Sequence, residues 1–136
     1  MSGCYESEIM KTVDIETARQ YYYEREAQRH TKRETERYQW LQRVREAVLR
    51  LVPHYPGVQR IYLFGSLVQP GRFRPDSDID MAVECDTIET ESAFWQALEQ
   101  ELKRSVDIRP LVGVIADLAT TNGELVYERQ DTRPDK

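Results

Sequence analysis

The sequence has few cysteines and no long apolar run. Its 136 residues include only two cysteines, Cys4 and Cys85, whose separation fits neither a CxxC pair nor a metal-ligand pattern. We therefore expect no disulfide framework and a cytoplasmic, reducing environment. No segment approaches the roughly 20 apolar residues that span a bilayer, and the N-terminus lacks the charged-then-apolar pattern of a secretory signal. The sequence thus predicts one ordinary domain with no membrane association.

The chain also lacks an excess of basic charge. Its formal net charge is -5; residues 1–60 carry 11 basic and 9 acidic side chains, and residues 61–136 carry 8 and 15. Strong binding to a nucleic-acid backbone requires clustered Lys and Arg, so we expect no strong direct nucleic-acid binding. The clustered carboxylates of the second half instead favour a divalent cation.

Neither glycine nor proline occurs between Asp14 and Val52, which predicts a long N-terminal helix. As one helix it is about 58 Å long, more than the width of a compact domain of this size. Its second half carries a core-facing stripe at helical spacing, formed by Leu41, Val44, Val48, Leu49 and Val52. The first half, residues 16–37, is mostly charged and has little to bury, so it is expected to project or to contact a partner or second copy.

Helix breakers and β-rich runs alternate after Pro53. The pattern predicts strands at residues 58–64, 79–83, 106–112 and 125–127, and helices at residues 89–104 and 113–121. This order predicts an α/β (α+β) domain with a small mixed sheet flanked by helices.

Two carboxylates lie two positions apart in one predicted strand. Side chains at this spacing point to the same face, so Asp78 and Asp80 leave one face while Ile79 enters the apolar layer. Like charges held this close need a cation or a raised pKa. Asp107 opens the next predicted strand and adds a third carboxylate if the two strands are neighbours. Three such groups can hold two Mg²⁺ ions roughly 3.5–4 Å apart, as in-line phosphoryl displacement requires.

A glycine and a serine mark the end of the strand before this pair. Gly65 and Ser66 begin thirteen residues before the first of the two aspartates. Glycine lets the backbone approach a ligand closely, and the hydroxyl and amide of Ser66 can bind an anion at the start of a helical turn. Arg72 and Arg74 lie in the same loop and are candidates for contacts with phosphate oxygens.

Together these residues resemble the DNA polymerase β-like nucleotidyltransferase superfamily. Its motif is a Gly-Ser at a strand end, a gap of about ten to thirteen residues, an Asp-x-Asp on the next strand and an Asp on a later strand. The matching residues are Gly65, Ser66, Asp78, Asp80 and Asp107. The resemblance is to the minimal nucleotidyltransferase (MNT) proteins in particular and covers roughly residues 42–128. One departure is the loop 67–71, which is one residue longer than the commoner Gly-Ser-x-x-x-Gly form.

The resemblance implies an activity and a partner. Superfamily members transfer a nucleoside monophosphate from a nucleotide triphosphate with Mg²⁺ to a hydroxyl and release pyrophosphate. Many MNT proteins are antitoxins of HEPN-family ribonuclease toxins, and members can transfer AMP from ATP to a tyrosine of the toxin. The resemblance thus implies an antitoxin that is a protein adenylyltransferase, with ATP as substrate and a HEPN toxin as partner.

The resemblance also implies roles for individual residues. Asp78 and Asp80 are expected to bind both Mg²⁺ ions, and Asp107 to complete one metal site and assist deprotonation of the acceptor hydroxyl. The Gly-Ser pair is expected to hold the β- and γ-phosphates. Ser77, which flanks the first aspartate in the motif, joins the nucleotide-binding candidates.

The expected domain organisation has three parts. Residues 1–40 form an N-terminal helical extension, residues 41–130 the MNT domain, and residues 131–136 a disordered tail. The cluster Tyr21, Tyr22 and Tyr23 is expected on an interface face, since aromatic residues are enriched in interface cores; self-modification and base stacking are alternatives. The extension is a candidate surface for a homodimer or a hetero-oligomer.

Two other functions fit the same residues. A nucleotidyltransferase-like domain can neutralise a toxin by contact alone, although the intact carboxylates and Gly-Ser pair argue against a dead enzyme. A nucleotidyltransferase for a small molecule or RNA needs an acceptor pocket, and so short a chain would have to form that pocket at a dimer interface.

Overall fold

The computed structural model describes the backbone of residues 2–130 and the side chains of residues 14–130. The chain divides into two compact units, Met1–Arg33 and Glu34–Lys136. The predicted disordered tail, residues 131–136, lies outside the described residues. The second unit contains every residue of the candidate site, and it includes residues 34–40, which the sequence analysis assigns to the extension.

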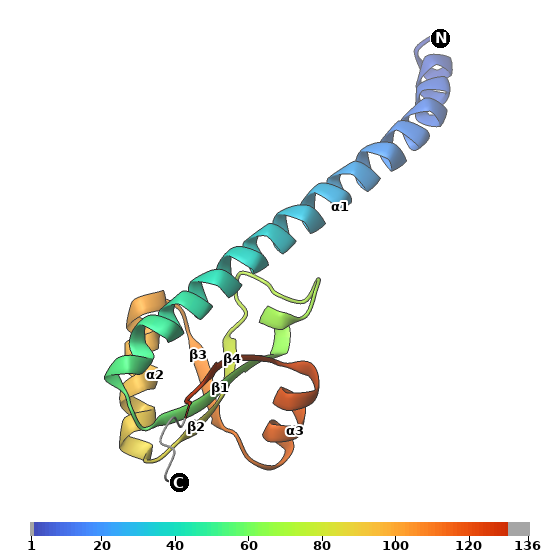
Figure 1. The fold of residues 1–136 in the computed structure, drawn as a ribbon. Helices are drawn as coiled ribbons and strands as arrows, with labels where there is room; N and C mark the ends of the chain where they lie inside the picture. The colour runs from blue at the N-terminus through green and yellow to red at the C-terminus, as the bar shows by residue number, and fades with distance from the viewer. Residues whose placement is uncertain (1, 131–136) are drawn as a thin grey trace. The chain divides into compact units, whose positions relative to one another are not determined.

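Residues 2–130 contain three α-helices and two short 3₁₀ helices. Figure 1 shows how the α-helices are arranged along the chain. The α-helices are α1 (Ser2–Leu51), α2 (Ile88–Leu102) and α3 (Gly113–Asn122), and the 3₁₀ helices are η1 (Val52–His54) and η2 (Gly65–Val68). The helix α1 ends at Leu51, one residue before the predicted end at Val52, and Val52 and Pro53 begin η1. No helix among the described residues combines the length and the apolar character needed to cross a lipid bilayer.

A mixed sheet of four strands forms the centre of the second unit, which confirms the predicted fold class. The strands are β1 (Val58–Phe64), β2 (Ile79–Cys85), β3 (Val106–Pro110) and β4 (Glu124–Glu128). Their order is β3-β2-β1-β4; β1 pairs antiparallel with both β2 and β4, while β2 pairs parallel with β3. The helix α2 makes the crossover that a parallel pair requires.

The two halves of α1 differ in burial, as their composition predicts. Every described side chain from Asp14 to Arg33 is exposed, and pairs such as Gln20–Glu24 join neighbouring turns. The expectation that residues 16–37 have little to bury is wrong at the end of this range, because Arg37 is only 4% exposed. Its charge is satisfied by residues that are distant in sequence, as described below.

The core lies between one face of the sheet and the helices α1 and α2. Its members are large apolar side chains that recur at helical spacing on α1 and α2 and at alternate positions on β1 and β2. They include Val44, Val48, Phe94, Leu98, Ile61, Leu63, Ile79, Met81 and Val83. Because Ile79 and Met81 face this core, Asp80 between them is directed to the opposite face.

The helix α2 also fixes the edge strand β3. The Thr87 hydroxyl caps the helix by accepting a hydrogen bond from the backbone N–H of Thr90 at 3.1 Å. Further along, Trp95 Nε1 donates to the carbonyl of Val106 at 2.6 Å, and the backbone N–H of Val106 donates to Glu99 Oε2 at 2.9 Å. These two side chains form hydrogen bonds with the N–H and the carbonyl of Val106 at the start of β3. The next residue, Asp107, therefore has a defined position.

Candidate active site

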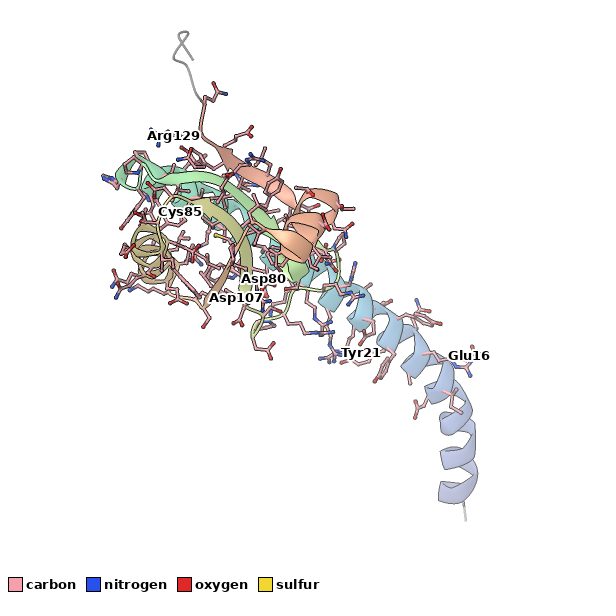
Figure 2. The ribbon with its side chains drawn as sticks, turned by 90° about the horizontal axis from the view of Figure 1, so that it is seen from below. Glu16, Tyr21, Asp80, Cys85, Asp107 and Arg129 are labelled. Carbon is pink, nitrogen blue, oxygen red and sulfur yellow. The ribbon has the colours of Figure 1, made fainter. Side chains whose placement is uncertain are left out.

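Two of the predicted site residues face each other across neighbouring strands. The parallel register of β2 and β3 pairs Asp80 with Asp107, and Figure 2 shows both side chains at the same end of the sheet. The sequence pattern predicts Asp78 and Asp80 in one strand. The strand β2 begins at Ile79, however, so Asp78 lies just before the strand. Asp78 is exposed, whereas Asp80 and Asp107 are half-buried.

The environment of Asp80 disfavours its negative charge. Burial raises the pKa of the Asp80 carboxyl above its ordinary value, and the nearby carboxylates of Asp107 and Asp78 raise it further. The Arg109 guanidinium opposes this shift. Asp80 is therefore close enough to both of the other predicted carboxylates to be repelled by them, which is an electrostatic condition that favours a cation.

The backbone at Gly65 passes directly beneath the Asp80 carboxylate. Gly65 has a φ of +77°, a left-handed conformation that residues with a Cβ rarely adopt. A Cβ at this position would lie 2.3 Å from Asp80 Oδ2. Glycine is required here for two independent reasons, and the close approach places the start of η2 beside the carboxylates.

Ser66 follows in the same 3₁₀ turn. Its carbonyl accepts a hydrogen bond from the N–H of Gln69 at 3.1 Å, which closes the turn η2. Its half-buried hydroxyl has no hydrogen-bond partner among the described residues. Ser66 thus lies beside Gly65 at the end of β1, where the sequence analysis expects a phosphate-binding residue.

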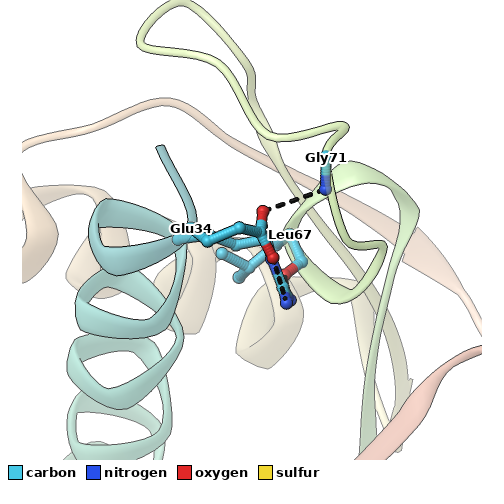
Figure 3. Close-up of polar contacts among 4 residues, drawn as sticks. Glu34, Leu67 and Gly71 are labelled. Atoms are coloured by element: carbon cyan, nitrogen blue, oxygen red, sulfur yellow. Dashed lines mark hydrogen bonds and ion pairs between the residues drawn. The ribbon is translucent and has the colours of Figure 1, made fainter. Parts of the chain in front are cut away.

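An ion pair from α1 holds the loop that follows η2 (Figure 3). Arg37 Nη1 donates to the carbonyl of Leu67 at 3.0 Å, and its Nη2 lies 3.0 Å from Glu34 Oε1. The other carboxylate oxygen of Glu34 accepts a hydrogen bond from the N–H of Gly71 at 2.9 Å. The long loop 67–71 is therefore attached at both ends to one helical turn.

A second arginine holds the segment that leads into Asp78. Arg104 donates to the carbonyls of Arg74, Pro75 and Ser77 at distances of 2.7–3.0 Å. Burial lowers the pKa of its guanidinium, and Asp78 and Asp76 act in the opposite direction. The segment is thus fixed through its backbone.

The predicted phosphate-binding residues of this loop differ in their contacts and exposure. The Ser77 hydroxyl accepts a hydrogen bond from the N–H of Arg74 at 2.9 Å, so it serves a local turn. Arg72 and Arg74 are exposed on the loop. Arg109, which the sequence analysis does not name, lies closer to the carboxylates: its Nη2 is 3.2 Å from Asp107 Oδ2.

The donor set suits Mg²⁺ in its chemistry. Asp78, Asp80 and Asp107 offer only oxygen ligands, and a cation would relieve the repulsion that Asp80 experiences from the other two. Among the described residues, no three acidic, histidine or cysteine side chains are grouped tightly enough to form a ready-made metal cage. This is compatible with Mg²⁺, which commonly takes one or two protein carboxylates together with substrate phosphates and water.

Sequence reasoning missed Arg37, Glu34 and Arg104. The Arg and Glu residues before position 38 resemble a solvated helix face, and this description is correct up to Arg33. A signal for Arg37 was available, because it precedes Leu41 and Val44 by four and seven positions and so shares their core-facing stripe. No comparable signal marks Arg104, because its partners are backbone carbonyls.

The fold and the site together define a class: a small mixed-sheet domain with a Gly-Ser turn beside converging carboxylates. A family model described as "Polymerase beta, Nucleotidyltransferase" matches residues 46–132. The chain belongs to this nucleotidyltransferase family.

Several solved structures of toxin-antitoxin complexes are similar to the chain. One is a mutant of the MntA-HpeT complex in which two aspartates are replaced by glutamate, with 27% identity and a TM-score of 0.54 over 63% of this chain and 74% of that chain. Another is a toxin-antitoxin structure with AMP-PNP, with 29% identity, the same coverage and a TM-score of 0.54. A third is an MntA-HpeT mutant with a tyrosine replaced by alanine, with 30% identity and a TM-score of 0.50 over 62% and 72% of the two chains. No curated protein matches the chain.

Proposed function

We propose that this chain is an antitoxin that transfers AMP from ATP, with Mg²⁺, to a tyrosine hydroxyl of a HEPN-family toxin and thereby neutralises it. The observation that carries the proposal is the pairing of Asp80 with Asp107 beside the Gly65 backbone. Membership of the nucleotidyltransferase family supports the reaction class. The likeness to toxin-antitoxin structures, one of them with AMP-PNP, supports the partner and the nucleotide.

In the proposed reaction the acceptor hydroxyl oxygen bonds to the α-phosphorus of ATP. The bond between that phosphorus and the bridging oxygen breaks, and pyrophosphate leaves with the electron pair. The proton of the hydroxyl passes to a carboxylate, for which Asp107 is the candidate because it is half-buried at the sheet edge beside Asp80. The Gly65-Ser66 turn would receive the phosphates, because the absence of a Cβ at Gly65 lets this turn lie against the Asp80 carboxylate, where the metal-bound nucleotide would be held.

Asp78, Asp80 and Asp107 would hold two Mg²⁺ ions. When bound, these ions would polarise the phosphate oxygens and stabilise the charge that develops on the leaving pyrophosphate. Arg109 would limit the repulsion among the carboxylates, because its guanidinium contacts Asp107.

The test combines the full chain with α-labelled ATP, Mg²⁺ and the product of the neighbouring gene. We expect label on a tyrosine of the partner, identified by mass spectrometry, and loss of the transfer in EDTA. The double variant Asp78→Asn/Asp80→Asn should slow the transfer by at least ~10³-fold, because metal stabilisation of the transition state contributes several kcal/mol.

A matched control distinguishes the loss of a carboxylate in the site from the loss of a carboxylate elsewhere in the same loop. Asp76 is an exposed carboxylate in the same loop, and Asp76→Asn should leave the rate within about twofold. If the double variant still neutralises the toxin stoichiometrically, the chain acts by binding alone. Label on RNA or on a small molecule, with none on protein, would indicate instead a nucleotidyltransferase that acts on RNA or on a small molecule.

We also propose that the N-terminal extension, residues 1–40, provides a contact surface for the partner or for a second copy. Tyr21, Tyr22 and Tyr23 are 55%, 70% and 78% exposed, far more than aromatic side chains usually are in a folded domain. Replacing all three by serine should weaken co-elution with the partner, or self-association, in size-exclusion chromatography. Unchanged elution profiles in both experiments would contradict this role.

A further inference from the structure

The guanidinium of Arg104 lies between two aromatic rings. Its Cζ is 4.6 Å from the centre of the Trp40 ring and 4.5 Å from the centre of the Phe73 ring. Arg43 lies over Trp40, with its Cζ at 4.0 Å from the ring centre. Arg43, Trp40, Arg104 and Phe73 therefore form an alternating series of cations and rings that joins α1, the segment between α2 and β3, and the loop before Asp78.

The edges of the same guanidinium face the backbone of that loop. Arg104 Nε donates to the carbonyl of Ser77 at 3.0 Å, and Nη2 donates to the carbonyls of Arg74 at 2.9 Å and Pro75 at 3.0 Å. These carbonyls belong to no strand ladder, so the arginine supplies hydrogen bonds that the loop cannot make with a neighbouring strand. A planar group with several fixed donors suits this task, whereas a lysine ammonium cannot stack and donate in the same way.

The anchored segment leads directly to the carboxylates. Ser77 is followed by Asp78, and the N–H of Ile79 donates to the carbonyl of Ser105 at 3.1 Å. Arg104 itself precedes Asp107 by three positions. One side chain thus connects the chain segment that carries Asp78 and Asp80 with the segment that carries Asp107.

We infer that Arg104 is a positioning residue for the candidate nucleotidyltransferase site. Its ring contacts and its hydrogen bonds hold residues 74–77 so that Asp78 and Asp80 keep their placement relative to Asp107. The kinetic consequences of this inference rest on the proposed function, whereas its structural content does not.

The test compares Arg104→Gln and Arg104→Lys with the matched control Arg45→Gln. Arg45 is a half-buried arginine whose guanidinium lies 2.6 Å from Glu124 on β4, so its replacement also breaks an ion pair in the same unit. The first readout is hydrogen exchange at the amides of Ser77 and Ile79, which are bonded to Arg74 and Ser105. We expect both Arg104 variants to lose protection at these amides by at least ~10-fold, while the control keeps it.

The second readout is the rate of AMP transfer with ATP varied. Displacing catalytic groups by about 1 Å can lower a rate by ~100-fold, so we expect kcat to fall by about 10- to 100-fold in both Arg104 variants. The KM for ATP should change far less, because η2, which contains Gly65 and Ser66, is held at Leu67 by Arg37 and not by Arg104. A purely structural role would instead make the Arg104 variants behave as Arg45→Gln is expected to, with lower thermal stability but kcat within about twofold of the parent, and that result would overturn the inference.

A second pair of variants covers the case in which Arg104→Gln does not fold. Trp40→Phe keeps a ring against the guanidinium and should retain loop protection, whereas Trp40→Leu should lose it. Protection and kcat that stay within about twofold of the parent in every folded Arg104 and Trp40 variant would overturn the inference. If the parent chain transfers no AMP to any acceptor, the proposed function fails, and the exchange measurements still decide the role of Arg104.

Discussion

At the scale of single residues, the site depends on a carboxylate held in an unfavourable place. Asp80 is half-buried, faces Asp107 across the strand pair and lies over the backbone of Gly65. Burial and the neighbouring carboxylates raise its pKa, which means that they disfavour the negative charge of Asp80. An uncharged polar side chain would occupy this position at a lower electrostatic cost. Such a cost is typical of sites that serve binding or catalysis and not stability.

Replacing this charge should stabilise the chain in the absence of metal. We expect Asp80→Asn to raise the midpoint of thermal unfolding in EDTA at neutral pH, because it removes repulsion with Asp107 and Asp78. Added Mg²⁺ should then raise the midpoint of the parent chain and leave that of the variant unchanged, since a ligand stabilises only the state that binds it. The exposed Asp76→Asn serves as control and should behave as the parent. A lower midpoint for Asp80→Asn in EDTA would contradict the argument.

The two reasons for glycine at position 65 can be separated experimentally. Gly65 and Gly113 both have positive φ, at 77° and 57°, but a Cβ at Gly113 meets nothing within 4 Å. Both Gly→Ala variants should lose about 1–2 kcal/mol of unfolding free energy from backbone strain. Only Gly65→Ala should also displace the Asp80 carboxylate and reduce AMP transfer. Equal activity in the two variants would show that the close approach at Gly65 has no role in the reaction.

At the scale of elements, the second half of α1 does more than cover the sheet, because it holds the loop of the candidate active site. Glu34 and Arg37 hold the loop after η2, while Trp40 stacks on the arginine that holds the loop before β2. The strands β2 and β3 supply Asp80 and Asp107, the helix α1 anchors the first part of the loop through Arg37 and Glu34, and Arg104 anchors its end. This division explains how a long loop, rich in proline and glycine, can present ordered residues.

The buried ion pair should be far more important for stability than an exposed pair of the same length. Arg37–Glu34 and Arg50–Glu101 are both 3.0 Å apart, but the arginine side chains are 5% and 57% exposed. Arg37→Met should cost about 3–5 kcal/mol, because it removes the guanidinium that bonds both the Glu34 carboxylate and the Leu67 carbonyl inside the protein. Arg50→Met should cost about 0–1 kcal/mol. Urea unfolding measures both values, and similar costs would contradict the role given to burial.

At the scale of the whole molecule, the family match and the compact unit begin at different positions. The match begins at residue 46, whereas the second compact unit begins at Glu34. The residues between them include Leu41 and Val44, which are 5% and 0% exposed, as well as Arg37. The foldable unit therefore extends further toward the N-terminus than the family match.

Two truncations test this boundary. Removing residues 1–33 should leave a folded chain with nearly unchanged thermal stability, because the described side chains from Asp14 to Arg33 are all exposed. Removing residues 1–45 should unfold it, since each buried apolar side chain contributes roughly 1.5–3 kcal/mol and domains have only about 5–15 kcal/mol in total. Circular dichroism and calorimetry distinguish the two outcomes; a cooperative transition in the shorter fragment would disprove the boundary at Glu34.

The elements were predictable because their signals are local. The β-rich run at residues 58–64 matches β1 without an error at either end, and the helices predicted at residues 89–104 and 113–121 agree with α2 and α3 to within two residues. The third strand is shorter than predicted, because the chain turns after Pro110 and Val112 becomes the residue before α3. The roles of the predicted site residues stay predictions.

The sequence by itself determined the order of the elements and the residue types of the candidate site, because periodicity, helix breakers and a short motif are properties of neighbouring positions. Only the tertiary structure decided that Asp107 pairs with Asp80, because strand order and register depend on how segments pack. It also decided that Arg37 and Arg104 are anchors, since their partners are carbonyls about thirty positions away. Every residue carries such a carbonyl, so no pattern in the sequence identifies which one an arginine will bind.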